Sequence, residues 1–309
     1  MGSIFTLSIV QSALELGCIY SLVALALFVS FSILNIADLS TDGCFTLGCA
    51  VCAMVTIAGH PILALFAAML AGVCSGFVTA FLQTKMGIES ILAGIIVNTG
   101  LYTINIAVMG FSSNVNLFNC NTIFSMAKQY IGGTWYRMLV ALVIVALIGS
   151  LLALFLNTRL GLSIRATGDN ADMVKASSIN PAFMITVGLC VANALTGLSG
   201  GVLAQYQKSC DINLGTGMVT IALASLIIGE TLIGKGSVVR RVIGVILGSC
   251  LYRFIVAVAL RLNVPAECLK LVSAIIVAVA IAFPYLKKKA AFLKQKTVAG
   301  SKYGKGGDV

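Results

Sequence analysis

Residues 157–181 read NTRLGLSIRATGDNADMVKASSINP and form a polar segment inside a chain that is otherwise almost continuously apolar. Long apolar runs lie on both sides, so both ends of this segment enter a membrane. It carries the charged residues Arg159, Arg165, Asp169, Asp172 and Lys175, and glycines at positions 161 and 168. Charges and unpaired backbone groups are costly in hydrocarbon, which places the segment in water. We call residues 157–181 the polar island and expect a soluble partner to dock there.

The composition places the whole chain in a membrane. Its 309 residues are 59% hydrophobic and 10% charged, with a mean hydropathy of +1.05, whereas a soluble domain has about 25% charged residues. The net charge of +10 does not indicate nucleic-acid binding, because the lysines and arginines gather in short loops and in the C-terminal tail. The predicted fold class is all-α, a polytopic bundle of transmembrane helices in a lipid bilayer.

Apolar runs long enough to be considered as membrane spans follow one another along the chain. They are residues 5–34, 44–59, 61–83, 90–110, 138–156, 182–205, 218–233, 242–260 and 269–286. The run at 44–59 is short for a crossing, which needs about 20 residues, and it follows a polar turn. We therefore expect a broken or re-entrant segment near residues 35–59 and about eight or nine membrane-crossing helices. Residues 1–289 form one transmembrane domain and residues 290–309 a basic, flexible tail.

The distribution of basic residues predicts the orientation of the bundle. One side holds the tail and Lys85, Arg159, Arg165, Lys175, Lys235, Arg240 and Arg241, and the other holds Lys128, Arg137, Lys208, Arg261 and Lys270. The side richer in Lys and Arg is cytoplasmic, so the polar island and the C-terminus are expected in the cytoplasm. The N-terminus is outside if all the runs cross and inside if residues 44–59 are re-entrant, and we favour the first.

Motifs for catalysis are absent from the sequence. It has no Walker-type glycine loop, no histidine cluster and no nucleophile with a plausible base. We therefore expect no enzymatic activity, no metal site and no cofactor in this chain. If transport is active, its energy comes from an ion gradient or from a partner that hydrolyses ATP.

A carrier coupled to an ion gradient needs titratable groups within its spans. The candidates are Glu15, Asp38, Asp42, Glu89, Glu230 and Arg253. The glutamates lie near predicted span ends, where solvation at the interface is the simpler interpretation, although Glu15 can instead face the bundle interior. Arg253 lies inside a span, where it snorkels to the outer surface or pairs structurally with a carboxylate.

The two aspartates lie with Ser40, Thr41 and Gly43 in the break between two helices. Asp42 can cap the helix that begins near Cys44 by accepting hydrogen bonds from its free N–H groups. The functional alternative is that this broken helix lines a translocation path, where an aspartate meets a substrate ammonium group. The sequence leaves both interpretations open.

The polar island also has two interpretations. It is either a solvated loop with an amphipathic helix on the membrane surface or a docking element for a cytoplasmic motor. Asp169 and Asn170 can cap a helix over residues 171–178, which Asn180 and Pro181 end. A short exposed helix braced by turns at both ends suits insertion into a groove on a partner, so we favour the docking element.

Three stretches resemble permease subunits in the branched-chain amino acid type of ABC importer. Residues 161–204 resemble the family's coupling segment, with serine replacing the usual glycine of the turn 178–180. Residues 226–253 resemble its LGGxGSxxGxxxGG segment, although Ile233-Gly234 stands for Gly-Gly and Arg240 or Arg241 stands where a small residue is usual. Residues 35–50, NIADLSTDGCFTLGCA, resemble the DLTVDGSFxxGAA element of a subgroup linked with tryptophan or tyrosine uptake.

The resemblance implies ATP-driven uptake of a small solute, an amino acid of aromatic or branched-chain type, by alternating access. It implies a second permease copy in a homodimer, two cytoplasmic ABC ATPase subunits that carry the ATP and Mg, and an extracytoplasmic solute-binding protein. The location implied is a bacterial-type plasma (inner) membrane. A proton- or sodium-coupled carrier built on Asp38, Asp42 and Glu230 is the alternative, and a channel without coupling is a third.

Carried onto this chain, the resemblance assigns two sets of residues. The ATPase-coupling loop comprises Arg165, Gly168, Asp169, Asn170, Asp172, Lys175 and Asn180. The translocation path comprises Asp38, Ser40, Thr41, Asp42, Gly43 and Gly48, and we add Asn98 from the apolar run 90–110, which the resembling stretches do not cover. No side chain in either set identifies the solute.

Overall fold

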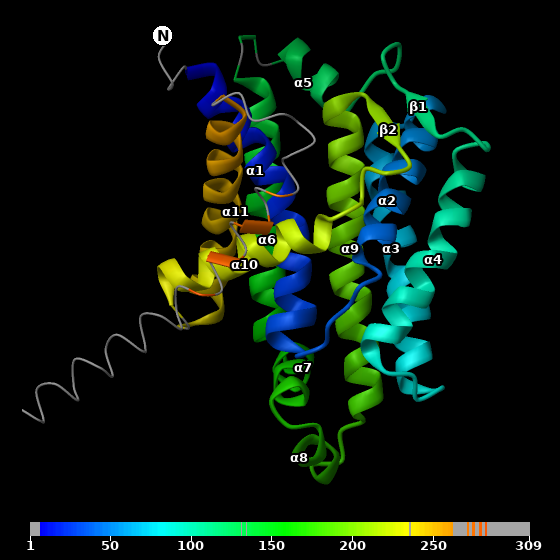
Figure 1. The fold of residues 1–309 in the computed structure, drawn as a ribbon, viewed down its shortest axis with the longest axis vertical. Coiled ribbons are helices and arrows are strands. Elements are labelled where there is room, and N and C mark those ends of the chain that lie inside the picture. Colours follow the sequence, from blue (N-terminus) through cyan, green and yellow to red (C-terminus); the bar gives the residue numbers. More distant parts are fainter. Residues whose placement is uncertain are drawn as a thin grey trace, which may run out of the picture.

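The computed structural model describes residues 7–261 apart from 131, 134 and 235, together with the isolated positions 271, 274, 275, 278, 279 and 282. The described residues form an elongated bundle that is helical except for one small β-ribbon (Figure 1). Six of its helices are long and apolar enough to cross a membrane, and two further apolar helices are shorter.

The elements follow the chain in this order. The helices are α1 (Leu7–Leu27), the π-helix η1 (Phe28–Ile33), α2 (Thr41–Ile57), α3 (Pro61–Thr84), α4 (Ser90–Val108), α5 (Ile123–Tyr130), α6 (Tyr136–Asn157), α7 (Arg159–Asp169), α8 (Ala171–Ala176), α9 (Pro181–Gln207), α10 (Met218–Ile233) and α11 (Val238–Arg261). The strands are β1 (Asn114–Asn116) and β2 (Ser209–Asp211), which pair antiparallel.

The expected helix count is only partly reached within the described residues. Six helices have the length of a span, and two further apolar helices, α2 and α10, are shorter. The predicted span 269–286 lies mostly outside the described residues, and the predicted tail 290–309 lies entirely outside them. The break predicted near residue 35 is present between the end of η1 and the start of α2.

Helix α9 is the centre of the bundle, with α1, α2 and α3 packed against it. Most of its side chains from Gly188 to Gln205 are buried. Small residues allow the close approach: a side chain at Gly200 would overlap the carbonyl oxygen of Phe45 on α2. Helices in membranes pack through such small residues, because lipid supplies little hydrophobic force to bring them together.

The two ends of the bundle differ (Figure 1). Helices α7 and α8 lie at one end, and α5, β1 and β2 lie at the other, where α1 also begins. Arg159, Arg165 and Lys175 belong to α7 and α8 and so lie together at one end, as their predicted grouping on one side of the membrane requires. The described part of the chain thus enters the bundle opposite the polar island.

Large apolar side chains cover the outside of the bundle. Ile62, Leu63, Phe66 and Leu70 of α3 are all more than half exposed, and α4 and α6 carry similar faces. Monomeric soluble proteins rarely expose contiguous apolar patches of this size. These faces, with six helices of spanning length, make the chain a membrane protein.

Two charged residues within the bundle have partners that the sequence did not predict. Glu15 is buried, and it accepts hydrogen bonds from Gln11 (2.9 Å) and from the hydroxyl of Tyr206 (2.8 Å). Of the two interpretations of Glu15, solvation at the interface is therefore wrong, and a side chain that faces the bundle interior is confirmed. The guanidinium of Arg253 lies 3.6 Å from the ring centroid of Tyr20, so among the described residues its partner is an aromatic ring rather than a carboxylate.

Candidate functional site

Helices α2 and α10 begin side by side in the middle of the bundle (Figure 1), and Asp42 joins them. Its Oδ2 accepts a hydrogen bond from the backbone N–H of Gly217 and its Oδ1 accepts one from Val219, both at 2.9 Å. The first N–H groups of a helix lack partners within the helix, and a negative charge is favourable beside them. Asp42 therefore caps α10. The prediction that it caps its own helix is wrong, because α2 already begins at Thr41.

Asp38 fixes the irregular segment between η1 and α2. Its Oδ1 accepts hydrogen bonds from the backbone N–H (2.8 Å) and the hydroxyl (2.6 Å) of Ser40, and its Oδ2 accepts one from Asn193 on α9 (2.8 Å). The Ser40 hydroxyl also lies 3.2 Å from the hydroxyl of Thr79 on α3. Asp38, Ser40 and Thr41 are all buried. These residues hold the break in place against α9 and α3.

A polar cavity of about 270 Å³ lies between the first turns of α2, one face of α4 and the loop 212–217 before α10. Its walls include Asp42, Gly43 and Thr46 from α2, and Asn98, Tyr102 and Asn105 from α4. The three α4 residues are four and three positions apart, so they share one face of that helix. The cavity thus meets the break in the helices at the point where α10 is capped.

Two glycines allow the elements that form the walls of this cavity to pack closely against each other. A side chain at Gly43 would place its Cβ 2.6 Å from Oδ1 of Asn98, and the Gly43 carbonyl accepts a hydrogen bond from Nδ2 of Asn105 (3.1 Å). On the opposite wall, a side chain at Gly215 would overlap the carbonyl oxygen of Asp42. The N–H of Gly215 donates to the hydroxyl of Thr46 (3.1 Å). Both α4 and the loop are therefore held tightly on the start of α2.

The residues predicted for the translocation path divide into two groups. Asp42, Gly43 and Asn98 come together at the cavity. Asp38, Ser40 and Thr41 brace the break, and Gly48 faces α9, where a side chain would overlap the carbonyl oxygen of Gly197. The sequence reasoning missed Thr46, Tyr102, Asn105 and the loop 212–217. The spacing of polar residues along α4 was the available signal for two of them.

Local caps determine the shape of the polar island. Asn170 accepts a hydrogen bond from the N–H of Met173 (3.0 Å) and caps α8, as predicted. Asp169 is instead the last residue of α7, a helix that the favoured interpretation of the island did not include. Asn180 accepts from the N–H of Ala182 (3.0 Å), and Pro181 is the first residue of α9, which suits the helix start because proline has no N–H.

Helix α8 ends earlier than predicted, at Ala176, in a Schellman motif. The N–H of Ile179 donates to the carbonyl of Val174 (3.2 Å), the N–H of Ser178 donates to that of Lys175 (3.1 Å), and Ser178 has a φ of 61°. Glycine adopts this left-handed conformation without a steric penalty, whereas for any other residue the conformation costs roughly 1–2 kcal/mol. This cost explains why glycine is usual at this position in the turn that residues 178–180 resemble. In this chain Ser178 adopts the same left-handed conformation.

The predicted coupling residues differ in exposure. Asp169, Asn170, Asp172, Lys175 and Asn180 are exposed, and Arg165 and Gly168 are partly buried. Val174 is buried and holds α8 on the bundle, so the rest of the helix projects into solvent. A side chain at Gly168 would overlap the carbonyl oxygen of Ile33. Helix α7 thus lies directly on the backbone of η1.

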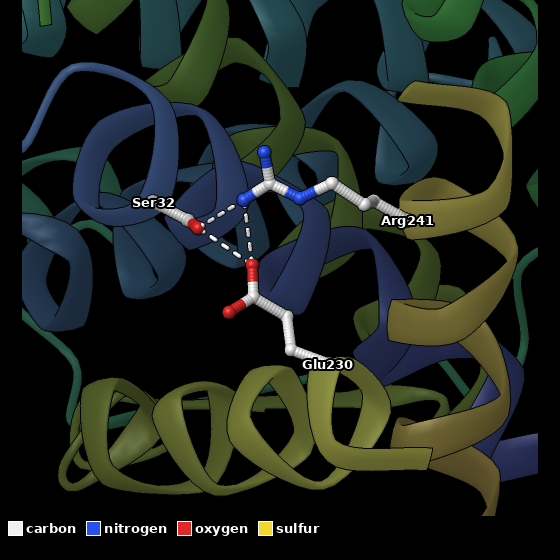
Figure 2. Close-up of polar contacts among 3 residues, drawn as sticks. All are labelled: Ser32, Glu230 and Arg241. Atoms are coloured by element: carbon white, nitrogen blue, oxygen red, sulfur yellow. Dashed lines mark hydrogen bonds and ion pairs between the residues drawn. The ribbon is translucent and has the colours of Figure 1, made fainter. Parts of the chain in front are cut away.

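An ion pair ties η1 to the far end of α10 (Figure 2). Nη2 of Arg241 on α11 lies 2.6 Å from Oε1 of Glu230 and donates to the hydroxyl of Ser32 (2.5 Å), which lies 2.6 Å from the same carboxylate oxygen. The side chains of Arg241 and Glu230 are 18% and 16% exposed, and the guanidinium stands 4.8 Å from the ring centroid of Phe28. The prediction that Glu230 is solvated at the interface is wrong, since its carboxylate pairs with arginine inside the bundle.

Known proteins resemble this chain over most of its length. Residues 9–282 match the family described as "Branched-chain amino acid transport system / permease component". A tyrosine transport system permease protein of Clostridioides difficile (strain R20291) is 35% identical over 267 residues, which cover 86% of this chain and 88% of that protein. The D-allose transport system permease protein AlsC of Escherichia coli (strain K12) is 38% identical over 106 residues, 33% of this chain and 32% of that protein.

Proposed function

Since this chain belongs to the family of branched-chain amino acid transport system permease components, we propose that it is the transmembrane subunit of an ATP-driven importer of an amino acid. A permease component is not itself catalytic, and permeases of ABC type work in general with ATPase and solute-binding partners. The observation that carries the proposal is the polar cavity at the break in the helices, which is connected through η1 to the exposed helix α8. The tyrosine permease among its relatives favours an aromatic amino acid as the solute.

The cavity has the properties of a passage for a small solute. Irregular backbone at membrane depth is tolerated where it is buried in protein or lines an aqueous cavity, and half-length helices that meet at such a place are a recurrent feature of transport sites. At about 270 Å³ the cavity is at the lower limit of small-molecule sites, which span about 300–1,000 Å³. This volume suits a single amino acid rather than a peptide.

The polar island connects the surface where we expect the ATPase to dock with the cavity, through elements that pack against each other. Exposed α8 is the proposed contact surface, and α7 lies behind it on the backbone of Ile33. From Ile33 the chain runs through the segment braced by Asp38 to Asp42 at the cavity wall. Because packed backbone transmits displacement with little compression, a movement of α7 shifts the start of α2.

A second connection runs through α10. Its first turn is capped by Asp42, and Glu230 near its last turn pairs with Arg241 and Ser32. Both ends of α10 are therefore bonded to the segment that includes η1 and the start of α2. We propose that α10 moves with this segment during alternating access, so that the cavity opens to one side of the membrane at a time.

The proposed assembly contains two copies of this chain, two cytoplasmic ATPase subunits that bind ATP and Mg, and an extracytoplasmic solute-binding protein. The plasma (inner) membrane is the proposed location, with eight or nine crossings and the polar island in the cytoplasm. The excess of basic residues at the α7–α8 end supports this orientation. An ion-coupled carrier is less well supported, because Asp38 and Glu230 take part in structural hydrogen bonds and lie outside the wall of the cavity.

Uptake measurements on the complete transporter test this function. Permease and ATPases are reconstituted in proteoliposomes that enclose ATP and Mg, with the binding protein and radiolabelled L-tyrosine, L-tryptophan or L-leucine outside. We expect uptake of at least one of them that requires ATP hydrolysis and stops when a non-hydrolysable analogue replaces ATP. Uptake that does not depend on ATP but requires an imposed proton or sodium gradient would establish the ion-coupled alternative instead.

A further inference from the structure

We propose that the cavity between α2, α4 and the loop 212–217 binds the ammonium group of the solute, with Asn105 and Asp42 as acceptors. This inference rests on the proposed function of the cavity as the passage for the solute. It adds the side chains that recognise the ammonium group of the proposed amino acid solute, and they would accept neither an anion nor a neutral sugar in its place.

Asn105 provides the first observation. The residue is 1% exposed and lines the cavity. Its Nδ2 donates to the carbonyl of Gly43 (3.1 Å), which fixes the orientation of the amide. Its Oδ1 is buried and has no hydrogen-bond partner among the described residues. A buried acceptor without a donor costs about 1–3 kcal/mol, and because Asn105 belongs to the cavity wall, a ligand in the cavity is the donor that we infer for it.

The negative charge of Asp42 determines which kind of hydrogen-bond donor a ligand in the cavity should carry. Each of its carboxylate oxygens accepts one backbone N–H, at Gly217 and Val219, and a carboxylate oxygen can accept a second hydrogen bond. The N-terminal end of a helix offsets only about half of an elementary charge. No basic side chain occurs among the described residues that line the cavity. The site therefore favours a cation with several N–H donors, which is what a primary ammonium group offers.

The face of α4 leaves space for the rest of an amino acid. Tyr102 lies three residues before Asn105 on the same face, and its side chain is about half exposed beside the cavity. Asn98 lies one further turn along. A solute whose ammonium group is at Asn105 can therefore extend along α4 past the Tyr102 ring, where stacking against an aromatic side chain is favourable.

The test measures binding to the permease–ATPase complex in nanodiscs, without ATP and without the binding protein. Radiolabelled L-tyrosine, L-tryptophan and L-leucine are the probes, and the competitors are tyramine, 3-(4-hydroxyphenyl)propionate and D-allose. We expect a bound amino acid to be displaced by tyramine, which keeps the ammonium group, and not by the other two. Asn105→Leu should weaken binding about tenfold, the effect of one hydrogen bond to a charged group.

Two variants separate recognition from folding. Asn105→Gln keeps both an acceptor oxygen and an N–H donor and is expected to hold the affinity within about threefold, whereas Asn116→Leu changes an exposed asparagine on β1 outside the cavity and should leave binding unchanged. The inference is overturned if none of the three amino acids binds, if 3-(4-hydroxyphenyl)propionate competes as well as tyramine, or if Asn105→Leu binds like the wild type. If Asn105→Leu leaves ATP-driven uptake intact, the ammonium site is rejected and the proposed function stands. If binding is selective for ammonium compounds but uptake does not require ATP, the site stands and the proposed function is rejected.

Discussion

Gly168→Val should abolish solute uptake and lower the thermal stability of the purified permease. Any Cβ at this position would overlap the carbonyl oxygen of Ile33 and press on the backbone at Leu34. Backbone atoms cannot move aside as a flexible side chain does, so α7 must shift away from η1. Overpacking of this kind costs about 1–3 kcal/mol or more. The measurements are ATP-driven uptake in proteoliposomes and the unfolding temperature in detergent.

A glycine in open surroundings provides the matched control. Gly100 on α4 has no atom within 4 Å of the position that a Cβ would occupy, so Gly100→Val is expected to unfold at the wild-type temperature. Gly168→Ala should show an intermediate loss. Wild-type uptake and stability in Gly168→Val would mean that α7 does not rest on η1, and the proposed route from the polar island to the cavity would be lost.

Arg241→Met is the second change with a large expected effect. It removes the guanidinium from Glu230 and Ser32 at a place where both charged side chains are less than one-fifth exposed. Removing one partner of a fully buried ion pair costs about 3–5 kcal/mol, because a charge is left in a poorly solvated site, and we expect a smaller cost for this partly buried pair. We expect a correspondingly lower unfolding temperature and a loss of uptake, since η1, α10 and α11 are no longer joined.

The double variant Glu230→Leu/Arg241→Met shows whether the pair acts as a unit. Replacing both partners by apolar residues removes the buried charge as well as the ion pair, so the double variant should be more stable than Arg241→Met alone. A double-mutant cycle on unfolding temperatures gives the coupling between the two side chains. If the double variant loses the sum of the two single losses, the ion pair does not hold these helices together.

Local signals in the sequence predicted part of the polar island. Asn170 caps α8 as expected, whereas Asn180 and Pro181, which were expected to end that helix, form the start of α9. Capping depends on residues only two or three positions apart, so the sequence contains all the necessary information. The end of α8 was predicted two residues late because the left-handed conformation of Ser178 is unusual for serine, and a glycine there would have marked it.

The cavity could be predicted only in part. Asp42 and Gly43 were assigned to the path from the break in the apolar pattern, which is visible in the sequence. The true partners of Asp42 are the N–H groups of Gly217 and Val219, about 175 residues further along the chain, and no local pattern reports such a contact. Asn105 shares a helix face with Asn98 and Tyr102, but it was missed because the sequence does not show that this face packs against Gly43.

The central claim is that the α7–α8 end of the bundle receives the ATPase, and site-specific photo-crosslinking tests it most directly. p-Benzoylphenylalanine is placed at Met173 on α8, which is 59% exposed, or at Tyr130 on α5 at the other end of the bundle, which is 86% exposed. Illumination of the assembled transporter is expected to join the ATPase to position 173 and not to position 130. A crosslink to the ATPase from position 130, with none from position 173, would contradict the account.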